Sequence, residues 1–92
     1  MIGEALRLIR IFHDCKTTDL AEALGLSASH ISEIESGKKK PSLETLEKYA
    51  SFFETSLSVI LYFSEELDKS TKKDNIRSKI IKFLQAVERT TT

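Results

Sequence analysis

The stretch from Thr17 to Pro41, TTDLAEALGLSASHISEIESGKKKP, constrains the fold of this 92-residue chain more than any other part. It contains two short runs whose apolar residues recur at helical spacing, the first of them beginning near Thr17. Gly25 separates the runs, at a point where a chain commonly leaves a helix through a left-handed conformation. Gly37 ends the second run, and Pro41 closes the lysine-rich loop that follows it. Two short helices joined by a tight glycine turn are typical of a helix-turn-helix.

The second of these helices is predicted over residues 27–36, with Ser27 as its N-cap. Ala28, Ile31 and Ile34 share one helical face and are the candidates for packing inward. The other side chains then point outward, namely Ser29, His30, Ser32, Glu33 and Ser36. In a helix-turn-helix that binds DNA, the second helix lies in the major groove and its outward residues reach the base edges.

The rest of the chain also predicts helices, so the predicted fold class is all-α. One proline, three glycines and few alternating apolar residues argue against strands. Residues 1–63 are predicted to form a five-helix domain that contains the helix-turn-helix, with the fifth helix within residues 57–63. Residues 64–74 are polar and lack hydrophobic periodicity, which predicts a linker or the frayed end of the fifth helix, and residues 75–89 predict a C-terminal helix.

The C-terminal helix carries an apolar stripe that must pack on another surface. The stripe consists of Ile76, Ile80, Phe83 and Val87, at spacings of four, three and four, reinforced by Ile81 and Leu84. A helix with two heptads of such a stripe is too short to be stable alone. It therefore packs either on its own domain or against a second copy across a two-fold axis.

The run LAEALGLSASHISEIESGKKKPSLETL resembles the lambda-repressor-type, or XRE-type, helix-turn-helix family, whose members are mostly sequence-specific DNA-binding transcription regulators. The similarity covers roughly residues 2–63. The residues that carry it are Leu20-Ala21, Leu24-Gly25, Ile31, Ile34-Glu35, Gly37, Pro41-Ser42-Leu43 and Leu46. The resemblance implies a five-helix lambda-repressor-like domain and favours a homodimer that reads two half-sites. On that hypothesis the dimerisation residues are Ile76, Ile80, Phe83, Leu84 and Val87.

Arg10 lies among apolar residues of the helix predicted over residues 2–13, where a charged group needs a partner. The resemblance supplies one, because a basic residue in the first helix of this family commonly pairs with the acidic residue at the position of Glu35. We therefore expect a partly buried ion pair between Arg10 and Glu35. The alternative is that Arg10 is exposed to solvent and Glu35 only adds charge to the end of its helix.

The expected DNA contacts fall into two groups. By resemblance, the base-contacting residues are Ala28, Ser29, Ser32 and Glu33, with His30 near the backbone or a base. The predicted backbone contacts come from Thr17 and Thr18 at a helix N-terminus, and from Lys38, Lys39 and Lys40. Arg, Asn and Gln, which make bidentate base contacts, are missing from residues 27–36.

Charge and composition exclude several other classes of protein. The whole chain has a formal net charge of zero, and residues 1–63 hold seven basic against nine acidic residues, a net charge of −2. This balance argues against a highly basic protein that coats nucleic acid. A single cysteine, Cys15, fits a reducing compartment, and without a signal peptide or membrane span the chain is expected to be cytoplasmic.

Neither an enzyme nor a metal or cofactor site is predicted. His13 and Cys15 have no third ligand nearby in the sequence, and the three glycines form no phosphate-binding loop. The predicted function is a homodimeric transcription repressor on a palindromic double-stranded DNA operator. The alternative is a protein-interaction module, such as an antitoxin that also represses its own operon or an antagonist of another regulator. Its partner would be a toxin or another regulator, bound by residues 59–63 or by the last helix.

Overall fold

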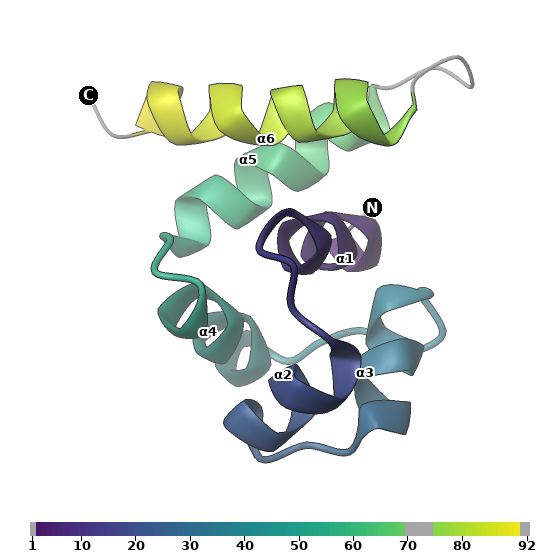
Figure 1. Cartoon of the computed structure of the whole chain (residues 1–92). Coiled ribbons are helices and arrows are strands. Elements are labelled where there is room, and N and C mark those ends of the chain that lie inside the picture. The colour runs from purple at the N-terminus through teal and green to yellow at the C-terminus, as the bar shows by residue number, and fades with distance from the viewer. Residues whose placement is uncertain (1, 70–74, 91–92) are drawn as a thin grey trace.

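The computed structural model describes residues 2–69 and 75–90 (Figure 1). Within these ranges every regular element is an α-helix, and the predicted all-α class is confirmed. The helices are α1 (Ile2–Phe12), α2 (Thr17–Leu24), α3 (Ala28–Glu35), α4 (Leu43–Phe52), α5 (Leu57–Asp68) and α6 (Ile76–Thr90). The first five form the domain with the helix-turn-helix, and α6 adds a C-terminal helix to it.

Local signals end α2 and start α3. Gly25 adopts a left-handed conformation with φ 71°, and the amide of Leu26 donates to the carbonyl of Ala21 at 2.9 Å. The Ser27 hydroxyl then accepts a hydrogen bond from the amide of His30 at 3.0 Å, as an N-cap does. The turn between the two helices therefore follows from residues that lie in the turn itself.

The core is built around α1, which lies among α3, α5 and α6 (Figure 1). Ala5, Leu6, Leu8 and Ile9 on α1 are almost completely buried. The largest fully buried side chains from the other helices are Leu20, Ile31, Ile34, Tyr49, Ile60 and Phe63. Burial of this apolar surface is the main contribution to stability. It also fixes the positions of α2 and α3 relative to the rest of the domain.

Helix α5 is longer than predicted. It runs from Leu57 through Asp68, so residues 64–68 are helical and do not belong to a linker. Leu67 lies one turn after the buried Phe63 and is itself buried, with 5 % exposure. Residues 64–68 therefore agree with the helix end and not with the linker, and a single apolar residue among charged neighbours was too weak a periodic signal to decide between them. Residues 70–74 of the predicted linker lie outside the described residues.

Helix α6 packs on α5 and α1 of its own chain, which is the alternative to the dimer expected from the resemblance. Phe83 is 4 % exposed and Ala86 is fully buried. The Phe83 ring lies with its centroid 5.4 Å from that of Phe12 and 5.3 Å from that of Phe63. One turn before Phe83 on the same face of the helix, Lys79 forms an ion pair with Glu4 of α1 at 2.6 Å.

The five residues expected at a dimer interface therefore divide into two groups. Phe83 belongs to the core of its own domain, Val87 packs against that core, and Ile80 is half-buried. Ile76 and Leu84 remain exposed, at 48 % and 47 %. These residues consequently do not form one free surface, and the stripe as predicted is not available as a whole to a second copy.

Gly3 allows α1 to approach the end of α3 closely. A Cβ atom at this position would overlap the carbonyl oxygen of Ile34 and lie 3.1 Å from that of Glu35. Because backbone atoms cannot move aside cheaply, we expect Gly3→Ala to lower the free energy of unfolding by about 1–3 kcal/mol. Thermal unfolding followed by circular dichroism measures this loss. The exposed helical residue Ser58 serves as the control, since Ser58→Ala changes little, and an equally stable Gly3→Ala protein would contradict the close approach.

Candidate nucleic-acid interface

The outer face of α3 presents short polar side chains. Ser29 and Ser32 are exposed, whereas Ala28 and His30 are half-buried. Ile31 and Ile34 on the opposite face are buried in the core, so the orientation of α3 about its axis is set by packing. The two serine hydroxyls can each donate or accept a hydrogen bond at a base edge, but neither makes a bidentate contact.

Glu33 is linked to the lysine loop. Its carboxylate lies 3.9 Å from the ammonium group of Lys39, and the amide of Lys39 donates to the Glu33 carbonyl at 3.1 Å. The same carbonyl accepts a hydrogen bond from the Ser36 hydroxyl at 3.2 Å. A residue expected at the bases and a residue expected at the phosphates are therefore neighbours, and each partly offsets the other's charge.

The lysine loop follows directly from the end of α3. Lys38, Lys39 and Lys40 are all exposed, and Gly37 before them has φ 87°, a conformation that suits glycine. Three exposed ammonium groups at the end of a candidate recognition helix can attract phosphate groups.

The N-terminus of α2 differs from those of α3, α4 and α5. These three helices begin with the serine caps Ser27, Ser42 and Ser56, each of which accepts a hydrogen bond from an amide in the first turn. At the α2 cap residue, Lys16, no side-chain hydrogen bond to the first turn is found within the described part of the chain. The amides near Thr17 and Thr18 can therefore receive an external anion, which a helix N-terminus favours.

Arg10 and Glu35 lie together beneath this surface. The Arg10 Nε donates to Glu35 Oε2 at 2.9 Å, Nη2 donates to Oε1 at 3.0 Å, and Nη1 donates to the carbonyl of Cys15 at 2.9 Å. The Tyr49 hydroxyl donates to the same carboxylate at 3.5 Å. One guanidinium group thus joins α1, the start of α2 and the end of α3.

The ionisation states support this network. The hydrogen bonds to Glu35 raise the pKa of Arg10 above its ordinary value, so the guanidinium stays charged at every pH at which the protein folds. Burial, together with the nearby Glu35 charge, raises the pKa of Tyr49, and burial also raises the pKa of Cys15. Both groups therefore remain neutral at physiological pH, and Tyr49 keeps its proton for the hydrogen bond to Glu35.

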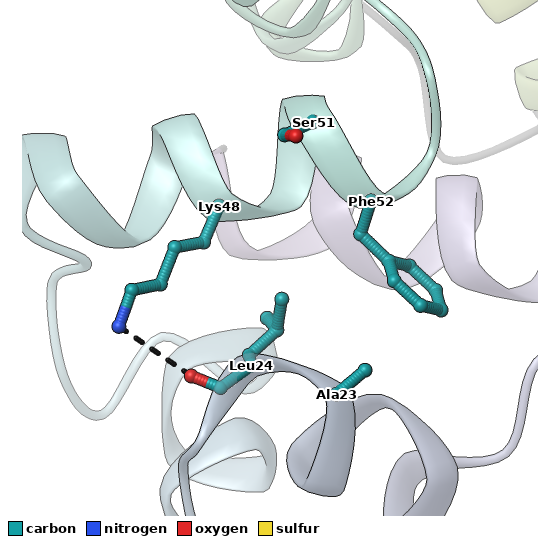
Figure 2. Close-up of a pocket in the computed structure, with 5 residues that line it drawn as sticks. All are labelled: Ala23, Leu24, Lys48, Ser51 and Phe52. Atoms are coloured by element: carbon teal, nitrogen blue, oxygen red, sulfur yellow. Dashed lines mark hydrogen bonds between the residues drawn. The ribbon is translucent and has the colours of Figure 1, made fainter.

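Sequence reasoning missed a contact that ties α2 to α4. Figure 2 shows Lys48 of α4 reaching across a shallow pocket, where its Nζ donates to the carbonyl of Leu24 at 3.4 Å. Phe52 and Ala23 line the same pocket, whose volume is about 290 Å³. Leu24 is the last residue of α2, and its carbonyl gains a donor there. The two residues lie 24 positions apart, so no sequence pattern could have paired them.

Residues 2–69 and 75–90 contain no cluster of three or more His, Cys, Asp or Glu placed to bind a metal ion. The His13 ring packs against Phe53, with 4.8 Å between the ring centroids. Across the same ranges, no helix combines the length and the apolar character needed to cross a bilayer.

Comparison with known proteins gives a consistent result. A family model described as "Helix-turn-helix" matches residues 6–60. The chain is 36 % identical over 61 residues to an uncharacterised HTH-type transcriptional regulator of Methanocaldococcus jannaschii, covering 66 % of this chain and 92 % of that relative. An uncharacterised HTH-type transcriptional regulator of Archaeoglobus fulgidus is 47 % identical over 47 residues, which are 51 % of this chain and 20 % of that protein.

A further relative comes from a bacteriophage. The ImmF control region 10 kDa protein of Bacillus phage phi105 is 40 % identical over 45 residues, which are 49 % of this chain and 50 % of the phage protein. The chain thus spans a fifth of the Archaeoglobus relative's length and half of the phage relative's length. No solved structure matches the chain with significance.

Proposed function

This chain belongs to the helix-turn-helix family of XRE-type transcriptional regulators, and on that premise we propose that α3 enters the major groove of an operator and reads its bases. The observation that carries the proposal is the position of Ser29 and Ser32. Both are exposed on the outer face of α3, whose inner face is buried. Ala28 and Glu33 complete the proposed base contacts, and an Ala28 methyl suits a thymine methyl.

The proposed phosphate contacts surround this face. Lys38, Lys39 and Lys40 follow α3, and the α2 N-terminus offers the amides and hydroxyls of Thr17 and Thr18. His30 completes the set near the backbone. Because the serines discriminate weakly between bases, we expect DNA shape to contribute much of the specificity.

We further propose that the chain acts as a repressor, with two copies on a palindromic operator. Half-sites one helical turn apart are separated by about 34 Å. The molecule measures 31 × 30 × 23 Å, so two copies can lie side by side with one on each half-site. Such a dimer would exclude other proteins from the DNA that it covers. A regulator of this kind works where the chromosome is, so a cytoplasmic location is part of the proposal.

Selection of bound sequences from random DNA duplexes at about physiological salt tests the proposal. We expect the intact chain to enrich a two-fold symmetric sequence. Failure to enrich any sequence would overturn the proposed function.

Charge removal from the lysine loop provides a specific prediction. Lys38→Gln combined with Lys40→Gln should weaken operator binding by about tenfold and lower the salt slope, d log K/d log [salt], by up to about 1.8, because two phosphate contacts are lost. Fluorescence anisotropy of a labelled duplex measures both quantities. The control, Lys69→Gln with Lys82→Gln, removes the same charge from the C-cap of α5 and from α6, and α6 lies at the opposite end of the molecule from α3 (Figure 1). Equal losses in the two double variants would show that only total charge matters.

A second candidate function is a protein-interaction module, such as an antitoxin or an antagonist of another regulator. The observation that favours it is a largely apolar hollow of about 410 Å³. It is lined by Ile2, Pro41, Leu46 and Leu61, together with Lys40, Ser64 and Glu65. Leu61 is 45 % exposed, whereas Val59, Ile60 and Phe63 of the same helix are buried. The variant Ser29→Ala with Lys39→Ala separates the two functions. If it loses DNA selection but still binds a co-expressed toxin or regulator, the interaction module is supported.

A further inference from the structure

The hollow at the start of α1 is formed by four segments that are far apart in the sequence. Its apolar wall consists of Ile2 of α1, Pro41 of the loop before α4, Leu46 of α4 and Leu61 of α5. Its volume of about 410 Å³ lies within the range of about 300–1,000 Å³ that is usual for small-molecule sites. A protein interface covers about 800 Å² on each partner, so the hollow by itself has the size for a small ligand.

Two residues of opposite charge also line the hollow. They are Lys40, in the loop after α3, and Glu65 of α5, and both are exposed. In the part of the chain that the structure describes, neither forms a hydrogen bond or an ion pair, so they do not pair with each other. The remaining polar residue, Ser64, is half-buried. A free charge of each sign beside an apolar wall is complementary to an apolar ligand that carries both charges.

We propose that this hollow binds a short apolar peptide with free termini, its carboxylate at Lys40 and its ammonium group at Glu65. The peptide's apolar side chains cover the wall of the hollow. A ligand with only a negative charge is repelled by Glu65, and one with only a positive charge is repelled by Lys40. A single amino acid carries both charges on one carbon atom. A dipeptide separates them by a further Cα–Cα step of about 3.8 Å, which suits two side chains that are too far apart to pair.

The backbone beside the hollow is largely fixed before a ligand binds. Pro41 restricts its own φ angle, and the residue before a proline is largely confined to extended conformations, which limits Lys40. The amide of Lys39 donates to the carbonyl of Glu33 at 3.1 Å, and this contact holds the loop to α3. Directly after Pro41, the Ser42 N-cap fixes the start of α4. Binding then requires little ordering of the backbone, which lowers its entropic cost.

Lys40 connects the hollow to the proposed DNA-binding surface. A peptide carboxylate at Lys40 withdraws this ammonium group from the DNA phosphates, so the peptide and the operator compete for it. The coupling is reciprocal, because each ligand must weaken the binding of the other by the same factor. This competition rests on the proposed function, whereas binding of the peptide to the chain alone does not.

Titration with the dipeptide Leu-Leu, followed by NMR of the isotope-labelled full chain without DNA, tests the peptide site. We expect saturable shifts at the lining residues, with a Kd on the order of 1 mM because both charges are exposed to solvent. The doubly capped peptide acetyl-Leu-Leu-amide lacks both charges and should bind about tenfold more weakly.

Charge exchange tests the assignment of the two termini. Lys40→Glu and Glu65→Lys should each weaken binding of Leu-Leu by about tenfold, because each places a like charge beside one terminus. The combined variant should restore the affinity, since the two side chains of Leu-Leu are identical and the peptide can bind in the reverse direction. Lys38→Glu is the control, because Lys38 belongs to the same loop but does not line the hollow, and it should leave the affinity unchanged.

Absence of saturable binding would overturn the proposal, as would equal affinity for the capped peptide or a combined variant that stays weak. The unfolding temperature of each variant is measured without peptide. It should stay close to that of the original chain, because Lys40 and Glu65 are exposed.

Fluorescence anisotropy of an operator duplex, with and without saturating Leu-Leu, tests the competition. We expect operator binding to weaken by about threefold, as for one lost phosphate contact, and an unchanged operator affinity would overturn the competition. DNA selection without peptide is measured separately. Loss of DNA selection with peptide binding intact, or the reverse, shows whether the proposed function or the peptide site has failed.

Discussion

Replacing Arg10 by alanine is expected to lower the free energy of unfolding by about 3–5 kcal/mol. The change leaves the Glu35 carboxylate, whose side chain is 6 % exposed, without its ionic partner. It also removes the donor to the Cys15 carbonyl. A small domain has a total stability of about 5–15 kcal/mol, so this one contact decides whether the fold survives moderate heating.

Urea unfolding followed by circular dichroism measures the loss. Arg7→Ala is the matched control, because it removes the same side chain from the same helix, where no ion pair involving Arg7 is found among the described residues. Arg10→Met combined with Glu35→Leu should recover most of the stability, because no buried charge is then left alone. An Arg10→Ala protein with an unchanged unfolding midpoint would contradict the role given to this ion pair.

Phe83→Ala is expected to cost about 3–5 kcal/mol of stability, as for other large aromatic side chains removed from a core. Phe83 is 4 % exposed and contacts Phe12 and Phe63, so its loss leaves a cavity between α6, α1 and α5. The loss should be the same at every protein concentration, because the contact lies within one chain. Thermal unfolding at several concentrations tests both statements.

Leu84→Ala is the control for Phe83→Ala. Leu84 is the next residue on the same helix but is 47 % exposed, so its truncation should change the unfolding temperature little in dilute solution. A destabilisation by Phe83→Ala that disappears on dilution, where the chain is monomeric, would instead place Phe83 between two copies.

Much of the helix-turn-helix could be predicted from the sequence because its signals are local. Gly25 takes the left-handed conformation that a short turn requires, and Ser27 and Ser42 cap α3 and α4 through amides three residues away. Such contacts depend on neighbours in the chain and not on the rest of the fold. The outward position of Ser29 and Ser32 also followed from helical spacing alone.

Contacts between distant residues were less predictable. Lys48 reaches Leu24 and Gly3 fits beneath the end of α3, yet neither residue belongs to a pattern that names its partner. The partner of Arg10 was predicted from the family resemblance. The apolar neighbours of Arg10 in its helix indicated only that the charged group needs some partner. The hydrogen bonds from Arg10 to the Cys15 carbonyl and from Tyr49 to Glu35 became visible only in three dimensions.

The C-terminal helix shows the difference most clearly. Its sequence by itself determined that a helix forms and that its apolar residues recur at helical spacing. Periodicity does not determine what an apolar helix face packs against, since the core of the same domain and the surface of a second copy can both be apolar. The tertiary structure decided this point, because α1 and α5 leave apolar surface that Phe83 and Ala86 cover, while Ile81 and Leu84 stay exposed beside Arg77 and Glu88. Local sequence thus determined where the helices form. The apolar surface of the neighbouring helices determined which face of the C-terminal helix is buried.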